Sequence, residues 1–165
     1  MRDDREFCVE LVVGDAGQAR FNAKYIGQLI DISKEFKGDF IIKSTGEKIE
    51  LKTDMQGHRT GNLFVELDMT TEGQKRRPGA AYQAIKHGCK YMVYQTEDGL
   101  EFWFDPTALK NRTELFRRTH GELYRRVDNV DRETGRAYWS GGLKMPKAEL
   151  TDLYLPIPLR RSDGK

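Results

Sequence analysis

The chain has 165 residues, of which 38% are hydrophobic and 33% are charged. This composition fits one compact domain and leaves little room for a second. No stretch approaches the ~20 apolar residues that span a bilayer, and the charged start, MRDDREFC, is unlike a secretory signal. We therefore expect a cytoplasmic protein with one domain over residues 1–160 and a disordered tail over residues 161–165.

The net charge is close to zero, because 28 lysines and arginines face 26 acidic residues. The balance of the whole chain therefore indicates no particular partner. The distribution is more informative: the stretch from Gln74 to Thr96 holds five cations and no acid. Such a stretch is either a solvated surface or a contact for an anionic partner such as nucleic acid.

Cysteine and histidine are too sparse for several kinds of site. The two cysteines, Cys8 and Cys89, belong to no CxxC pair, and the three histidines are dispersed along the chain. This pattern argues against a disulfide framework and against a zinc site. We expect both cysteines to be reduced.

In chain order, the first predicted element is an amphipathic helix over residues 16–32, because apolar side chains recur there at a spacing near 3.6. Asp15 is its expected N-cap. The runs DFIIKS and EKIELKT, on either side of Thr45 and Gly46, predict a β-hairpin. After a polar loop, the run NLFVEL predicts a third strand beside that hairpin. Three strands behind one helix favour an α+β fold with a central mixed sheet flanked by helices.

The middle of the chain continues this alternation. Residues 70–78 form a long basic loop, and AAYQAIKHG predicts a short helix that ends at Gly88. The runs KYMVYQ and LEFWFD predict two more strands, and Pro106 opens a helix that reaches about Arg118.

The C-terminal third is less regular. The run TGRAYW is a candidate hairpin, and the pair Gly141 and Gly142 suggests a break. The prolines of YLPIPL predict an edge strand or an extended strap.

The residues that suggest chemistry are Asp39, Glu50 and Lys52. Glu50 and Lys52 are two apart on a predicted strand, so both leave one face while Leu51 points into the core. With a two-residue loop at positions 45 and 46, the residue numbers of two paired residues on the hairpin add up to 91. Asp39 then lies opposite Lys52 on that face. A four-residue loop keeps Asp39 on the face, and a three-residue loop turns it away.

Two carboxylates beside an ammonium form a hard oxygen site for a divalent cation that keeps several waters. Such a site suits phosphodiester hydrolysis, in which the cation neutralises phosphate charge and the lysine positions water or stabilises developing charge. The alternative is a salt-bridged triplet on the protein surface.

The order of a helix, GDFIIKS and GEKIELKT resembles the core of the PD-(D/E)XK nuclease superfamily, which has a restriction-endonuclease-like fold. The resemblance covers about residues 12–105 and is closest to small phage-type and restriction-like members. Its signature Asp is Asp39, preceded here by Gly38 instead of proline, and its ExK is Glu50, Leu51 and Lys52. A phage-encoded chain of this family would act in the host cytoplasm.

The resemblance implies roles for individual residues. Asp39, Glu50 and the carbonyl of Leu51 would hold Mg²⁺, with Mn²⁺ as a substitute, and Lys52 would serve the attacking water. Many relatives carry a glutamate in the first helix, and this chain has Gln18 at the matching place. A glutamine adds no charge, so the number of metal ions is open. Glu66 is either a further metal ligand or a solvent-facing carboxylate.

The expected DNA contacts lie in the basic segment and beside it. Each has an ordinary alternative as a surface residue, and for Asn62 the alternative is closing a turn. These residues are Asn62, Lys75, Arg76, Arg77, Gln83 and Lys86.

The function implied by the resemblance is a Mg²⁺-dependent deoxyribonuclease. One alternative is a Holliday-junction-resolving endonuclease of the same fold, which requires a homodimer with two active sites. Gln18 favours a second alternative, a catalytically inactive nucleic-acid-binding or assembly module that keeps the fold. A third is a protein-interaction domain without a nucleic-acid role. Whether cleavage is endo or exo does not follow from the sequence.

Overall fold

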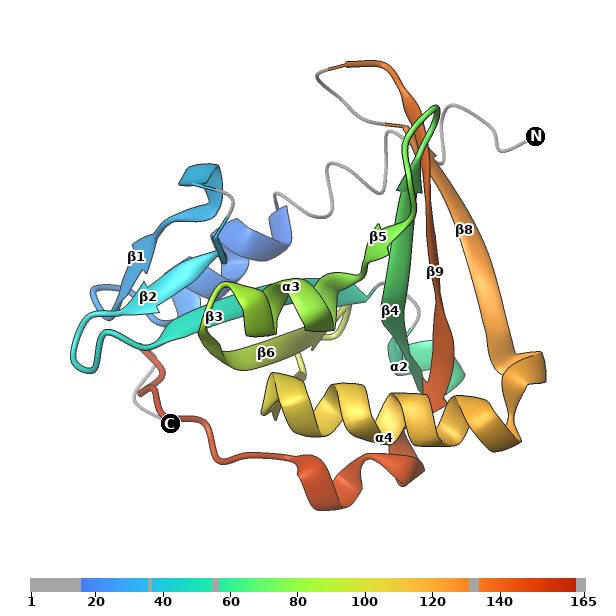
Figure 1. Ribbon diagram of the computed structural model, residues 1–165. Helices are drawn as coiled ribbons and strands as arrows, with labels where there is room; N and C mark the ends of the chain where they lie inside the picture. Colours follow the sequence, from blue (N-terminus) through green and yellow to red (C-terminus); the bar gives the residue numbers. More distant parts are fainter. Residues whose placement is uncertain (1–15, 36, 55–56, 131–133, 163–165) are drawn as a thin grey trace.

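Two sheets organise the computed structural model, which describes residues 16–35, 37–54, 57–130 and 134–162 (Figure 1). The first sheet has the strand order β1-β2-β3-β6-β7 and the second has the order β5-β4-β9-β8. The strands of the first are β1 (Leu29–Asp31), β2 (Phe40–Ile42), β3 (Lys48–Asp54), β6 (Cys89–Thr96) and β7 (Glu101–Phe104). Those of the second are β4 (Asn62–Thr71), β5 (Arg77–Pro78), β8 (Tyr124–Val130) and β9 (Ala137–Pro146).

Helices and short 3-10 turns complete the described structure. A helical segment over residues 16–24 precedes β1. The other helices are α2 (Gly57–Thr60), α3 (Ala80–Lys86) and α4 (Pro106–Thr119). The 3-10 turns are η1 (Ser33–Glu35), η2 (Gly121–Leu123), η3 (Lys147–Glu149) and η4 (Thr151–Leu153). Within the described residues, every helix is too short or too polar to cross a membrane.

The first sheet is mixed, as the sequence predicts, and the architecture is α+β. Its strands β3 and β6 run parallel, and its other pairs are antiparallel. One face packs on the helical segment through a cluster that includes Phe21, Tyr25 and Trp103. The other face packs on the second sheet and on α3 and α4 through a cluster that includes Leu63, Met92 and Leu109. The first sheet is therefore covered on both faces.

The predicted helix over residues 16–32 is wrong in its second half. The helical segment ends at residue 24, and Gly27 has φ +78°, a conformation that side chains rarely adopt. The residues that follow form β1, which pairs with β2. The apparent helical spacing included Ile26 and Ile30, which are exposed in the fold. Asp15, the expected N-cap, lies outside the described residues.

The third predicted strand also has a different neighbour from the one expected. β4 pairs with β5 and β9 in the second sheet, and β3 pairs with β6. The break expected at Gly141 and Gly142 is absent, because both glycines lie inside β9. A Cβ at Gly141 would collide with the Tyr124 hydroxyl, so the glycine allows a close approach of strands instead of ending one.

The C-terminal strap is extended, as the prolines predict. The Leu155 amide donates to the Trp103 carbonyl at 2.8 Å, and Leu159 is buried in the cluster beside the helical segment. The Ser162 amide donates to the Lys24 carbonyl at 3.0 Å. The strap therefore ties residue 162 to the last turn of the helical segment. Residues 163–165 of the expected tail lie outside the described structure.

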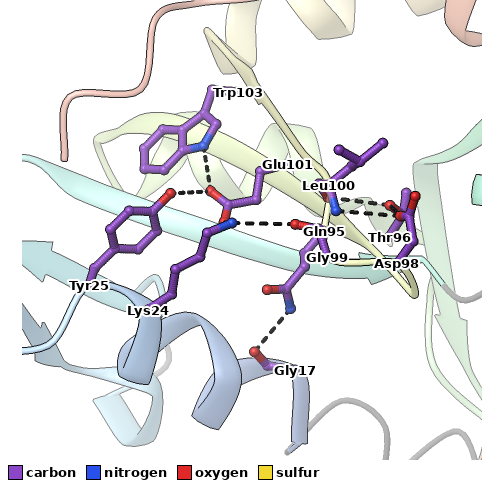
Figure 2. Close-up of polar contacts among 10 residues, drawn as sticks. All are labelled: Gly17, Lys24, Tyr25, Gln95, Thr96, Asp98, Gly99, Leu100, Glu101 and Trp103. Atoms are coloured by element: carbon purple, nitrogen blue, oxygen red, sulfur yellow. Dashed lines mark hydrogen bonds and ion pairs between the residues drawn. The ribbon is translucent and has the colours of Figure 1, made fainter. Parts of the chain in front are cut away.

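A buried carboxylate joins the helical segment to β7 (Figure 2). The Glu101 side chain is fully buried and accepts from the Tyr25 hydroxyl at 2.6 Å and from the Trp103 indole at 2.9 Å. Its second oxygen pairs with the Lys24 ammonium at 2.5 Å. Burial, then Glu101 itself, raises the pKa of Tyr25, so this phenol stays a donor. The network holds the helix against the sheet that carries the candidate site.

Candidate metal and nucleic-acid site

The hairpin register brings the signature carboxylates together. Phe40 pairs with Ile49 and Ile41 with Lys48, so partner numbers sum to 89 instead of the expected 91. The difference arises because four residues, 43–46, separate Ile42 from its partner Glu47. This even-length loop keeps the parity. The paired residues end at Phe40, and the Asp39 amide donates to the Ile49 carbonyl at 2.9 Å. The Asp39 side chain reaches the Leu51 amide, and the charges of Glu50 and Lys52 act on it. The register differs by two residues from the one that would place Asp39 opposite Lys52.

Asp39 is held by two donors from different elements. Its Oδ1 accepts from Gln18 Nε2 at 3.0 Å, and its Oδ2 accepts from the Leu51 amide at 2.7 Å. The residue predicted to lean into the site from the first helix therefore touches the signature aspartate. Each oxygen of a carboxylate has two lone pairs, so both still have acceptor capacity. The bonds fix the Asp39 carboxylate beside β3.

Burial, and after it the negative charge of Glu50, raise the pKa of Asp39 to about 6. The Leu51 amide and the Lys52 ammonium act in the opposite direction without cancelling the effect. When two carboxylates are neighbours, each makes the ionisation of the other more costly. A bound cation would offset this cost, so such a pair is typical of a cation site.

Lys52 is the internal counter-charge of the site. Its ammonium lies 3.2 Å from Glu50 Oε1. Burial alone would lower the pKa of Lys52, but Glu50, Glu66 and Asp39 together hold that pKa above its usual value. Lys52 is therefore an ammonium at neutral pH. In that state it can donate hydrogen bonds and stabilise negative charge, and it cannot take up a proton.

Glu66 comes close to the site from the second sheet. It lies on β4, which the sequence placed next to the hairpin, and its charge nevertheless acts on Lys52 across the sheet-to-sheet contact. The expected strand neighbour is thus wrong, although the charge of Glu66 helps to raise the pKa of Lys52. Whether Glu66 serves as a ligand stays a prediction.

The chemistry of these donors fits Mg²⁺ better than a metal that needs a full protein cage. In the described part of the chain, no three histidine, cysteine or acidic side chains are grouped closely enough to hold a metal by themselves. Mg²⁺ is commonly held by one or two carboxylates, with waters and substrate phosphates completing the shell. Asp39 and Glu50, with the Leu51 carbonyl between Glu50 and Lys52, match that pattern.

Of the residues predicted to contact DNA, some are bonded to other protein groups and others are exposed. Arg76 pairs with Asp68 at 2.5 Å, and Arg77 donates to the Thr71 hydroxyl at 2.9 Å. Gln83 donates to the Pro78 carbonyl at 3.3 Å. Both of the remaining cations, Lys75 and Lys86, are exposed. Asn62 follows α2. Its backbone amide donates to the Thr60 hydroxyl, in agreement with a turn-closing role.

The fold places two arginines outside the basic segment over aromatic rings. The Arg117 guanidinium lies 4.5 Å from the ring centroid of Tyr124, and that of Arg126 lies 4.1 Å from the ring centroid of Trp139. The Tyr124 hydroxyl donates in turn to buried Asp68, the partner of Arg76. Arg117, near the end of α4, and Tyr124, at the start of β8, are close in the chain. Arg126 and Trp139 come together only through the pairing of β8 with β9.

Tyr94 is a further residue near the site, and the sequence did not single it out. It pairs with Lys52 in the parallel register of β3 and β6. Because β6 follows β3 by some 40 residues, no local pattern links the two side chains.

Comparisons with protein-family models, with curated proteins and with solved structures find no match to this chain.

Proposed function

We propose that the chain is a Mg²⁺-dependent deoxyribonuclease that hydrolyses phosphodiester bonds, and that its α+β architecture is a version of the restriction-endonuclease-like fold. The observation that carries the proposal is the grouping of Asp39, Glu50 and Lys52: Asp39 accepts from the Leu51 amide, and Lys52 pairs with Glu50. A salt-bridged surface triplet accounts less well for this arrangement, because the part-buried Asp39 carboxylate is held by the Gln18 side chain and the Leu51 amide, while Lys52 pairs with Glu50.

Each residue has a distinct task in the proposed reaction. Asp39 and Glu50, with the Leu51 carbonyl, would hold the cation, which supplies charge neutralisation at the phosphate and a more acidic water. Lys52, held protonated by its acidic neighbours, would donate to the phosphate oxygens as their charge increases. Gln18 orients Asp39 by a hydrogen bond and contributes no charge.

The test of this function is the conversion of supercoiled plasmid to nicked or linear DNA. We expect the wild-type chain to cut with Mg²⁺ or Mn²⁺ and to be inactive with EDTA. Lys52→Ala should lower the rate by about 10²–10³-fold, because it removes a donor that is strongest in the transition state. Lys43→Ala, which removes an exposed lysine from the β2–β3 loop, is the control and should cut at the wild-type rate. A wild type that leaves plasmid intact with every divalent cation tested would contradict the proposal.

DNA backbone contact is proposed for the exposed cations of the second sheet and of α4. Figure 1 shows β4, β8 and β9 standing on one side of the molecule, across from β1 and β2. Stacking on Tyr124 and Trp139 restrains Arg117 and Arg126. Arg126 is exposed and Arg117 is half-buried. Arg126 also pairs with Asp128 at 3.3 Å, but both side chains are largely exposed, so the pair is weak.

The salt dependence of DNA binding tests these contacts. For each phosphate that the protein no longer neutralises, the slope of log K against log salt should become less negative by roughly 0.9. We expect this change for Arg117→Ala and Arg126→Ala, measured separately by fluorescence anisotropy with duplex DNA. Lys43→Ala removes the same charge from the β2–β3 loop, across the molecule from β8 and β9 in Figure 1, and should leave the slope unchanged. Equal slopes in all four proteins would exclude these arginines from the interface.

The inactive binding module remains the second candidate, and Gln18 is the observation that favours it. Its bond to Asp39 occupies the place where related nucleases carry a further negative charge. This candidate predicts salt-dependent DNA binding with no cleavage by wild type. The two experiments above therefore separate it from the nuclease.

A further inference from the structure

Tyr94 carries the one buried side-chain nitrogen or oxygen that lacks a hydrogen-bond partner in the described part of the chain. The residue is 2% exposed, so its hydroxyl is also removed from bulk solvent. Such groups are rare in folded proteins, and each one calls for an explanation such as a catalytic role or a bound ion. The feature is therefore a candidate for function.

The position of Tyr94 relates it to the candidate site. Tyr94 on β6 is the direct partner of Lys52 on β3. Partners on neighbouring strands project from the same sheet face, so the phenol and the ammonium leave the sheet side by side. The ring also packs edge-on against Phe104, with the centroids 6.1 Å apart, and this contact restrains its direction.

Three acidic side chains act electrostatically on the phenol. Burial is the largest cause that raises the pKa of Tyr94, and Glu66, Asp54 and Glu50 follow in that order. Tyr94 therefore keeps its proton at neutral pH and remains a donor. Glu66 is the strongest of the three charges on the phenol and also acts on Lys52. The same carboxylate is thus near both neighbouring side chains.

We propose that Tyr94 is a positioning residue: its hydroxyl donates a hydrogen bond to the Glu66 carboxylate and holds that carboxylate beside Lys52 in the loaded site. The inference rests on the proposed function and extends it to a group supplied by β6. Hydrogen bonds of this kind are often long in the free protein and tighten on loading. A neutral phenol suits the task, because it steadies the carboxylate without neutralising the charge that a cation needs.

Tyr94→Phe tests the proposal by removing one oxygen. The matched control is Tyr91→Phe, on the same strand. The Tyr91 hydroxyl lies away from the site and donates to Glu47 over a distance of 3.4 Å. Two readouts are needed: the Mg²⁺ concentration for half-maximal thermal stabilisation, and the kcat and KM of plasmid cleavage. We expect Tyr94→Phe to raise the Mg²⁺ concentration for half-maximal stabilisation about tenfold. It should also lower kcat about tenfold and leave the KM for DNA unchanged. Tyr91→Phe should change neither.

A double-mutant cycle with Glu66→Gln separates positioning from other roles. If Tyr94 acts through Glu66, Tyr94→Phe should have little further effect in the Glu66→Gln background. An equal effect in both backgrounds would overturn the proposal. The proposal would also be overturned if Tyr94→Phe kept the Mg²⁺ response and the turnover of the wild type, because the hydroxyl would then have no role in the site.

The outcomes also separate this inference from the proposed function. A wild type that is stabilised by Mg²⁺ but cuts no DNA contradicts the nuclease, and the Mg²⁺ titration of Tyr94→Phe still decides the role of the tyrosine. If wild type and Tyr94→Phe cut DNA equally well and respond equally to Mg²⁺, only the positioning role of Tyr94 is contradicted. A wild type whose melting temperature ignores Mg²⁺ overturns the positioning role.

Discussion

Asp39→Asn is expected to make the metal-free protein more stable at pH 7.5 while removing the proposed DNA cleavage. Burial and the charge of Glu50 raise the pKa of Asp39 to about 6, so ionising this carboxyl in the folded protein is costly. Asparagine has nearly the same shape and never ionises. Its amide can still accept from the Leu51 amide and, with the Gln18 amide turned over, donate to Gln18.

The pH dependence of this effect has a definite sign. The folded pKa of Asp39 lies above the ordinary aspartate value, so the protonated form favours folding below about pH 4, and that contribution is lost as pH rises through about 6. The Asp39→Asn protein should not show this loss. Denaturant unfolding in EDTA should therefore give equal stabilities near pH 4 and a gain of about 1–3 kcal/mol for Asp39→Asn above pH 6.

Magnesium should reverse the order of stability. A cation that binds only the folded state adds about 2.7 kcal/mol at one hundred times its dissociation constant. Wild type should gain this stabilisation, and Asp39→Asn should gain little and cut plasmid roughly 10²-fold more slowly or less. If Asp39→Asn is less stable than wild type in EDTA at pH 7.5, the hydrogen bonds from Gln18 and Leu51 outweigh the cost of the buried charge, and the electrostatic account of the site is wrong.

Glu101→Ala is expected to cause the largest loss of stability in the chain. The substitution leaves the Lys24 ammonium, the Tyr25 hydroxyl and the Trp103 indole without their shared acceptor in a buried place (Figure 2). Removing one partner of a buried ion pair costs about 3–5 kcal/mol. That is a large fraction of the roughly 5–15 kcal/mol that stabilises a typical domain.

Thermal unfolding should show the effect as a fall of roughly 10 °C in Tm, at about 2–4 °C per kcal/mol for a chain of this size. Glu101→Gln keeps an acceptor for Tyr25 and Trp103 and should lose less. Asp152→Ala is the matched control for an exposed ion pair, since Asp152 pairs with Arg112 at 2.6 Å while 63% exposed. It should cost under about 1 kcal/mol. Equal losses in Glu101→Ala and Asp152→Ala would show that the buried network is not what holds the helical segment.

Local patterns predicted the elements that depend on nearest neighbours. Asp105 and Pro106 start α4, where the aspartate accepts from the Ala108 amide at 2.9 Å, as a helix N-terminus requires. The same patterns failed for residues 25–32, where Gly27 ended the helix and exposed apolar side chains had imitated a helical face. They also failed at Gly141 and Gly142, because the reason for glycine there is contact with Tyr124 and Val65 on neighbouring strands.

The sequence by itself predicted Asp39, Glu50 and Lys52 on one sheet face, because side chains alternate with a period of two and an even-length loop preserves that parity. Only the tertiary structure decided that β6 lies beside β3, that β4 joins another sheet, and which distant side chains approach the site. Gln18, Glu66 and Tyr94 come close to it through packing of whole elements. Such contacts depend on the fit of buried surfaces far apart in the chain, and no spacing within a short segment records that fit.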